Sequence, residues 1–454
     1  MKRGEVTAFL SLIFILLITF TAGLMESASI QMAKNYCRAD TDRALESVFA
    51  EYQKELLDEY DIFAMEATYE SGKYSQEAVT NRLKYFGAGR AEHKIQKIQF
   101  LTDQGAKAFC EQITYYMENK YGVGFLSDKV SMTDIWKKQE EKAKEYEQEE
   151  SESWSDFDGM LSEAEGTLPE EDNPIEGIRQ LKKSSLLNLI MPEDVAVSEK
   201  SIDLNGVVSS RDRNQGYGDF SEEAKSDSAI SDLLFGEYLM EHFSMMTDRE
   251  NTGTLDYELE YIYGGKGSDR ENLEIVAKKL LLMRFASNFV FLQGSSAKKA
   301  EAEAMAFTLC TIAALPALEA AAAQVILLAW AYGESIMDLR SLMQGLKVPL
   351  VKTEESWQLS ISGLMALKET GNLNDGKDSE TGLTYKEYLR ILLFLKKKET
   401  VAMRALDLVE ENLRTRHGME FFRADYCVSR IQLKSTSYLR RGVSYRFYTY
   451  FGYN

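Results

Sequence analysis

The sequence has few of the residues that usually build reactive or cross-linked sites. Its 454 residues contain only four cysteines and three histidines. The cysteines lie far apart along the chain, which favours neither a disulfide framework nor a zinc site. The histidines stand alone, and there is no His-Glu-x-x-His, Gly-x-Ser-x-Gly or Cys-x-x-Cys motif. We therefore expect no metal ion, no cofactor and no enzymatic activity.

Positive charge and proline are also scarce. The formal net charge is −19, which argues against nucleic acid as a partner and against peripheral binding to anionic lipid. Only five prolines occur, and this scarcity, together with many Ala, Leu, Glu and Lys residues, favours long helices. The chain is long enough for two or three domains, and its 44% hydrophobic content is ample for packed cores.

One long apolar run stands at the N-terminus. Residues 6–25 carry no charge, and a helix of that length spans about 30 Å, the thickness of a bilayer's hydrocarbon core. A cleaved signal peptide, with a weak cut site at Ser27-Ala28-Ser29, is the alternative, but its apolar region would be shorter. Because Lys2 and Arg3 precede the run, we expect a single-pass protein of the cell membrane, with a cytoplasmic N-terminus and an extracellular body.

The anchor has no local stop signal at its outer end. Residues 26–57 contain neither proline nor glycine, and their apolar positions recur near helical spacing. We expect one helix from about Glu5 to Leu57, whose outer half forms a stalk that packs on the body. The N-terminal part, including QMAKNYCRADTDRALESV at residues 31–48, resembles TadE/TadG-like proteins, which are pilin-related components of Tad pilus systems.

The rest of the chain predicts a mainly α-helical α+β fold with a small antiparallel sheet. We divide it into an anchor and stalk (1–57), the first part of an α+β outer domain (58–136), an acidic, partly disordered insertion (137–174) and a helical body with C-terminal strands (175–454). Residues 93–104 alternate like a strand. We expect them to pair with strands at the C-terminus, which turn near Arg441-Gly442.

Two glycine-rich stretches invite a ligand-binding interpretation. Residues 254–267 are expected to form a strand and turn, but the glycines lack the spacing of a phosphate-binding loop. Ser268 and Glu271 instead predict a capped helix start. The loop before Thr384 resembles a calcium loop in composition only, and Thr384 and Glu387 predict another capping box.

A second apolar stretch lies at residues 304–333. Pro316 and Glu319 divide it into two uncharged parts, each shorter than a membrane span and rich in alanine. We expect a buried helical hairpin, with a second membrane span as the alternative.

A group of polar and aromatic residues ends this hairpin, and it is the candidate site in the sequence. Its members are Trp330, Tyr332, Glu334, Asp338 and Arg340. We interpret it as a buried polar network that stabilises the fold, with a partner or ligand pocket and an active site as alternatives. Glu258 and Glu260, on one face of the expected strand, are predicted to form structural ion pairs with Arg270 or Arg284.

A second resemblance covers more of the chain. The segments GEYLMEHFS (236–244), LLLMRFASNFVFL (280–292) and TYKEYLRILLFL (384–395) are among those that resemble an uncharacterised family of Firmicutes, a domain of unknown function found near Tad pilus genes. The resemblance spans residue 231 to the C-terminus, with the N-terminal anchor. It implies the membrane and other Tad or pilus assembly proteins as partners, and no known active site.

Overall fold

The computed structural model describes residues 3–122, 127–170, 172–220, 229–248, 253–366 and 376–453. The longer helices and the strands are α1 (Arg3–Phe49), α2 (Lys54–Tyr60), β1 (Met65–Glu66), α3 (Gln76–Leu83), β2 (Glu92–Phe100), α4 (Asp103–Tyr121), α5 (Ser127–Glu163), α6 (Pro174–Lys183), α7 (Leu186–Ile190), α8 (Ala229–His242), α9 (Glu258–Gly264), α10 (Asp269–Gly294), α11 (Ser296–Ile312), α12 (Glu319–Met343), α13 (Ile361–Ala366), α14 (Tyr385–Leu395), α15 (Lys398–His417), β3 (Cys427–Tyr438) and β4 (Ser444–Gly452). The chain forms two compact units. Unit 1 comprises Met1–Tyr116, Val208–Ser226 and Val409–Asn454, and unit 2 comprises Met117–Val207 and Asp227–Leu408.

Each unit is assembled from separated stretches of the chain, whereas the sequence suggested consecutive segments with boundaries at residues 57, 136 and 174. The expected class of mainly helical α+β fold is confirmed, with a long N-terminal apolar helix and a small antiparallel sheet that includes the C-terminal strands.

The sheet of unit 1 is built around β3. Strand β2 pairs with one edge of β3, and β1 and β4 pair with β3 as well, all antiparallel. Ile95 lies opposite Leu433, and Leu433 lies opposite Thr449. The expected pairing of residues 95–100 with C-terminal strands is thus confirmed. Beyond β3 the chain turns at residues 440–442, where Gly442 has a φ of +74°, as the position of Arg441-Gly442 predicted.

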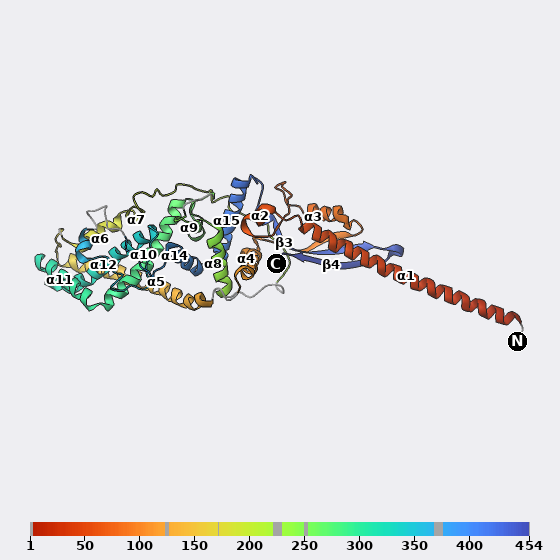
Figure 1. Ribbon diagram of the computed structural model, residues 1–454, viewed down its shortest axis with the longest axis horizontal. Coiled ribbons are helices and arrows are strands. Elements are labelled where there is room, and N and C mark those ends of the chain that lie inside the picture. Colours follow the sequence, from red (N-terminus) through yellow and green to blue (C-terminus); the bar gives the residue numbers. More distant parts are fainter. Residues whose placement is uncertain are drawn as a thin grey trace. The chain divides into compact units, whose positions relative to one another are not determined.

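Helix α1 supplies one wall of the unit 1 core. Its C-terminal part buries Ala44, Leu45, Val48 and Phe49 against the apolar side chains of the sheet. Figure 1 shows α1 in red running beside the β3–β4 hairpin and continuing beyond it. The side chains of residues 6–20 on that continuation are exposed. One helix therefore joins an exposed apolar segment to a packed core.

The end of α1 corrects the expected helix. It ends at Phe49 rather than near Leu57, and a separate helix, α2, begins at Lys54. The Tyr453 hydroxyl donates to the Phe49 carbonyl, and the Gln53 amide donates 2.9 Å to the Ala64 carbonyl. Backbone groups that would continue the helix are thus bonded to distant parts of the chain. Such contacts leave no local signal in the sequence.

Within the described ranges, two helices are long and apolar enough to cross a membrane. In the first helix, residues 4–49, the most apolar 18 residues have a mean hydropathy of 2.4, and none of them is buried. In the second helix, residues 316–343, the most apolar 18 residues have a mean hydropathy of 1.3, and 78% of them are buried. The second helix is therefore a core helix of unit 2, as the expected hairpin requires of its second half. The first half is only partly buried, because Phe307 and Ile312 on α11 are 57% and 67% exposed.

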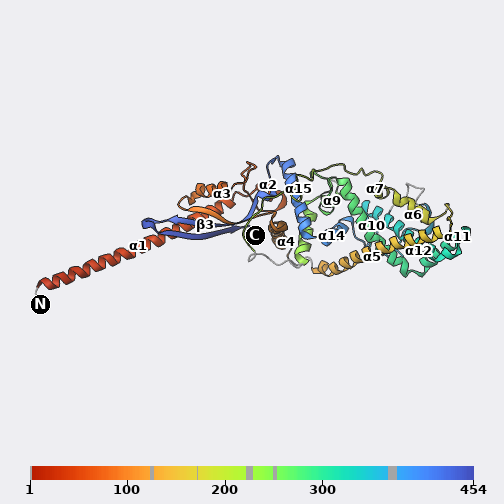
Figure 2. The same cartoon turned by 180° about the vertical axis from the view of Figure 1, so that it is seen from behind.

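Unit 2 is a helical assembly around α12. Helices α10 and α11 pack against it, and so do α5, α6 and α7. Its core includes Phe285, Phe289, Ile326, Leu328 and Trp330. Figure 2 shows these elements from behind.

Helix α5 corrects the expected disordered insertion. Residues 127–163 form one helix, which includes most of the acidic stretch. Trp136, Ala143 and Phe157 are buried on it, and their spacing by multiples of seven places them on one face. A narrow apolar stripe is thus enough to hold a helix whose other faces are charged.

Helix α9 corrects the expected strand. Residues 258–264 are helical, and the helix ends where Gly265 adopts a φ of +70°. Both predicted caps are present: the Ser268 hydroxyl accepts from the Glu271 amide, and Thr384 and Glu387 form a full capping box. Part of the loop compared with a calcium loop, at residues 367–375, lies outside the described residues.

Candidate functional site

All five residues of the predicted candidate site lie on α12, but only Glu334 and Asp338 belong to a buried cluster of charged groups. Glu334 and Asp338 lie one turn apart and are fully buried within unit 2. The Lys352 ammonium lies 2.5 Å from Oε1 of Glu334 and 2.7 Å from Oδ1 of Asp338. The Arg284 guanidinium lies 3.0 Å from Oδ2 of Asp338. Two carboxylates and two cations therefore form a buried, charge-balanced cluster.

Neutral groups complete the bonding of this cluster. The amides of Gln358 and Leu359 donate to Glu334 at 2.9 and 2.7 Å. Asn288 donates to Oδ2 of Asp338 at 3.0 Å, and Arg284 donates to the Tyr388 hydroxyl at 3.0 Å. Every carboxylate oxygen of the pair thus has a partner within the protein. A buried, fully bonded network of this kind holds elements together and leaves no oxygen for a substrate.

The surroundings shift the pKa values of the two carboxyls in opposite directions. Burial raises the pKa of Glu334, and the nearby Asp338 raises it further, against the opposing effect of Lys352. Burial alone would also raise the pKa of Asp338, but Arg284 and Lys352 outweigh it and hold that pKa below its ordinary value. Asp338 is therefore the ionised centre of the cluster.

The other three predicted residues lie around this cluster rather than in it. The Trp330 indole donates a hydrogen bond of 2.8 Å to the carbonyl of Leu359, the residue whose amide donates to Glu334. Tyr332 is half-buried beneath the Lys182 ammonium, 5.0 Å from its ring centre, and burial raises its pKa to about 12. Arg340 donates to the Leu189 carbonyl. The sequence thus located the acidic half of the network but missed Lys352, Asn288 and Tyr388.

Glu258 and Glu260 do not form the expected ion pairs with Arg284, whose partner is Asp338. The Met246 amide and the Tyr385 hydroxyl donate to Oε1 of Glu260 at 3.0 and 2.7 Å. Burial raises the pKa of Glu260 to about 7. Glu260 is therefore a second buried polar centre of unit 2, built from α9 and α14.

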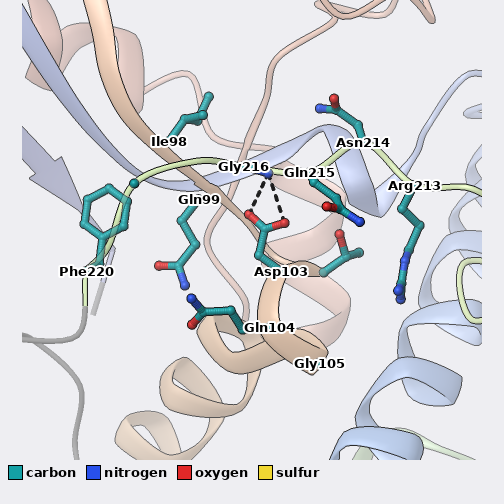
Figure 3. Close-up of a pocket in the computed structure, with 12 residues that line it drawn as sticks. Ile98, Gln99, Asp103, Gln104, Gly105, Arg213, Asn214, Gln215, Gly216 and Phe220 are labelled. Carbon is teal, nitrogen blue, oxygen red and sulfur yellow. Dashed lines mark hydrogen bonds between the residues drawn. The ribbon is translucent and has the colours of Figure 1, made fainter.

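An open pocket lies in unit 1, where β2 meets α4. Its volume is about 340 Å³. It is lined by Ile98, Gln99, Thr102, Asp103, Gln104, Gly105, Arg213, Asn214, Gln215, Gly216, Gly218 and Phe220. In Figure 3 the amide groups of Gln99 and Gln104 face each other on one side of Asp103, and Arg213 lies on the other side.

The wall of this pocket has an unusual backbone. Gln104, Gly105 and Ala106 have φ angles of +52°, +70° and +65°, all in the left-handed region. Such a conformation costs about 1–2 kcal/mol for each residue other than glycine. Asp103 offsets part of that cost, because its carboxylate accepts from the Phe100 amide at 2.7 Å and from the Gly216 amide at 3.1 Å. Strained backbone of this kind is concentrated at functional sites.

The segment around Gly216 closes over the free edge of β2. Ile98 and Tyr217 exchange two backbone hydrogen bonds, of 2.9 and 3.0 Å. A Cβ on Gly216 would lie 2.2 Å from the Ile98 carbonyl oxygen and 2.4 Å from Oδ2 of Asp103, so only glycine fits. Burial raises the pKa of Asp103, although both amide bonds oppose the shift. Sequence reasoning missed this pocket, although the Gly216-Tyr217-Gly218 run is a signal of close backbone approach.

Among the described residues, no group of three His, Cys, Asp or Glu side chains is placed to hold a metal ion. The four cysteines are buried thiols. The lining of the pocket is rich in side-chain amides, which suit hydrogen bonding to a small polar ligand.

Comparison with protein families identifies the central and C-terminal part of the chain. A family model described as "Family of unknown function (DUF5702)" matches residues 164–438. No curated protein and no solved structure matches the chain. The matched range includes all of the buried cluster and the Gly216 side of the pocket.

Proposed function

The chain belongs to DUF5702, a family of unknown function, and we propose that it is a membrane-anchored, non-enzymatic component of a Tad/Flp-type pilus or secretion apparatus. Helix α1 carries the proposal. Its N-terminal half presents an uncharged, exposed run of membrane length, and its C-terminal half is part of the unit 1 core. A flexible tether could not orient a folded unit in this way, whereas a continuous helix does so.

The orientation follows from charge. Lys2 and Arg3 precede the run and Glu26 follows it, so the N-terminus stays in the cytoplasm, and unit 2 and the part of unit 1 that follows residue 25 are extracellular. The proposed partners are other Tad assembly proteins, in line with the resemblance of residues 31–48 to TadE/TadG-like proteins and with the resemblance of residue 231 onward to a Firmicutes family found near Tad pilus genes. The closed bonding of Glu334 and Asp338 supports a structural rather than a catalytic role for that cluster.

The topology is tested with protease added to intact protoplasts. Digestion of both units with survival of only a short fragment around residues 4–25 is the expected result. Survival of the whole chain would place the units inside and overturn the proposal.

The apparatus is tested by deletion of the gene and by anchor exchange. Deletion should abolish piliation or Tad-dependent secretion, and the wild-type chain should restore it. A chain in which an unrelated single-pass helix replaces residues 4–25 should fail to restore it, because pilin-like helices pack against partner helices in the membrane. Unchanged piliation and secretion after deletion would contradict the role in the apparatus.

The Asp103 pocket favours a second candidate function, an anchored ligand-binding protein. The observation is the strained turn at Gln104, Gly105 and Ala106 beside a pocket lined by amide groups. The test is calorimetric titration of the detergent-solubilised chain with small polyhydroxylated and amide-containing compounds. Binding that is lost in Gln104→Ala but kept in the exposed control Gln96→Ala would support this function. Binding unaffected by Gln104→Ala would exclude the pocket.

A further inference from the structure

The β3–β4 hairpin runs alongside α1, and its turn points toward the apolar half of that helix (Figures 1 and 2). Three contacts fix the alignment. The Phe49 and Phe451 ring centres lie 4.6 Å apart, the Cys37 thiol lies 3.3 Å from the Ser437 hydroxyl, and the Lys34 ammonium lies 5.5 Å from the Tyr445 ring centre. Strand β4 therefore runs in the same direction as α1, away from the N-terminal apolar run. The turn at residues 439–443 is the part of the hairpin nearest that run.

The height of the turn follows from helix and strand geometry. From Met25, where the uncharged run ends, to Lys34 the helix rises about 14 Å. From Tyr445 back to the turn the strand descends about 10 Å. The turn therefore lies about 4 Å above the level of Met25, measured along α1. The polar headgroup layer on each side of a bilayer is about 5–7 Å thick, so the turn falls within it.

The residues at this end of the hairpin suit that layer. Tyr438, in the last strand pair before the turn, is 68% exposed, and Arg440 in the turn is exposed as well. Tyrosine is enriched at membrane–water interfaces, where its ring and hydroxyl meet apolar and polar surroundings. The turn also contains the aliphatic residues Leu439 and Val443, which are half-buried.

Basic groups outnumber acidic groups near the turn. Arg90 is exposed, and its carbonyl accepts from the Ser437 hydroxyl, which places it beside the hairpin together with Lys34. The acidic residues in this region are Glu26, Glu92 and Asp40. Asp40 is already 3.0 Å from Arg43 and 3.9 Å from Arg90.

We propose that residues 438–444 form a second membrane contact, which binds the anionic phospholipid headgroups of the leaflet from which α1 emerges. The proposal rests on the proposed function, because it needs α1 to span the membrane. The net charge of −19 does not oppose it, since charges farther than about 8–10 Å are screened at physiological salt. Although the chain as a whole is acidic, Arg440, Arg90 and Lys34 lie near the hairpin at one end of unit 1. Two contacts, α1 and the turn, would set the tilt of unit 1 on the membrane.

The test measures the depth of the turn in the full-length chain, reconstituted into nanodiscs of phosphatidylcholine and phosphatidylglycerol. A fluorophore is attached at Ser444→Cys, an exposed position in the last strand pair before the turn. The matched control is Tyr450→Cys, which is also exposed and lies about 20 Å higher on β4. The native cysteines are buried. Quenching by headgroup spin-labelled lipid should be severalfold stronger at residue 444 than at residue 450.

A charge variant tests the lipid class. Arg440→Gln in the Ser444→Cys chain should lower the ratio of quenched to unquenched fluorophore about fivefold at the same phosphatidylglycerol content, because each basic residue at an anionic surface contributes about that factor to partitioning. Equal, weak quenching at residues 444 and 450 in chains retained by the discs would overturn the contact and leave the anchor standing. Quenching that does not depend on phosphatidylglycerol would overturn the headgroup assignment. Failure of the chain to insert at all would overturn both the contact and the proposed function.

Discussion

The Lys352 ammonium lies 2.7 Å from Oδ1 of Asp338, with both side chains fully buried, and Lys352 is also paired with Glu334. Lys352→Met would leave the charge of Glu334 uncompensated in the interior. Breaking such a buried pair from one side costs about 3–5 kcal/mol. All four tryptophans, Trp136, Trp154, Trp330 and Trp357, lie in unit 2. Urea unfolding followed by tryptophan fluorescence therefore measures the loss.

The control for this variant is Lys347→Met, at an exposed position five residues earlier. It should change the free energy of unfolding by less than about 0.5 kcal/mol. Adding Glu334→Gln to Lys352→Met removes the stranded charge and should recover part of the loss. Equal stability of the two single lysine variants would show that the pair contributes nothing.

The periodicities in the sequence were sufficient for much of the fold. Alternation at residues 93–104 and the aromatic C-terminal stretch predicted two partners of one sheet, which the structure pairs. The capping signals at Ser268 and Thr384 also predicted helix starts correctly. These features depend on neighbours within a few residues, so they can be read locally.

The features that the sequence did not predict depend on distant contacts. Helix α1 ends at Phe49 because Tyr453 bonds its carbonyl from the far end of the chain. The YELEYIY stretch reads as a strand by alternation, but its glutamates bond to groups around Ser244 and Tyr385 as part of a short helix. The charged stretch from Lys137 was predicted to begin as a helix, but the full length of α5 was not predicted, because Trp136, Ala143 and Phe157 are few among many charges.

The candidate site was half predicted for the same reason. Glu334 and Asp338 stand out because carboxylates are rare in an apolar helix. Lys352 follows a short loop segment and looks like an ordinary surface lysine, so nothing local marks it as buried. The strained turn at Asp103 depends on the Gly216 amide, more than a hundred residues away.

The buried carboxyl of Glu260 predicts a pH-dependent stability of unit 2. Its folded pKa is about 7, raised by burial from an ordinary value of 4.5. The folded state therefore holds a proton that the unfolded state releases between these values. The contribution of this group is fully present below about pH 4.5 and is lost as the pH rises through about 7, which amounts to about 3 kcal/mol.

The check is urea unfolding of the wild-type chain and Glu260→Gln across pH 4–8. The amide mimics the protonated acid, because its oxygen still accepts from Met246 and Tyr385. The stability of the variant relative to wild type should rise by about 3 kcal/mol over this range. Glu399→Gln, at an exposed position of α15 within unit 2, should follow the wild-type profile. A constant difference between Glu260→Gln and wild type would refute the shift.

Packing of α1 on the sheet predicts different effects for two apolar residues of the same helix. Leu45 is 1% exposed within the unit 1 core, and Met32 is 58% exposed. Leu45→Ala should cost about 2–5 kcal/mol, since it leaves a cavity. Met32→Ala should cost less than about 0.5 kcal/mol. Hydrogen exchange of the β2 and β3 amides measures the difference, and similar protection in both variants would mean that α1 is not docked on the sheet.

Gly216 predicts how one wall of the unit 1 pocket is held against β2. In Gly216→Ala the new methyl group would lie 2.2 Å from the Ile98 carbonyl oxygen and 2.4 Å from Oδ2 of Asp103. Neither can move freely, because the first belongs to β2 and the second supports the left-handed turn at Gln104. The segment must therefore separate from β2, which breaks the two hydrogen bonds between Ile98 and Tyr217. Faster hydrogen exchange of these two amides is expected, with a loss of about 1–3 kcal/mol in the free energy of unfolding from overpacking.

Gly89→Ala is the control, because no atom from elsewhere in the protein lies within 4 Å of its added methyl group. If the Ile98 and Tyr217 amides exchange equally slowly in both variants, the segment is not held by the fit at Gly216, and the pocket wall must be stabilised by other contacts.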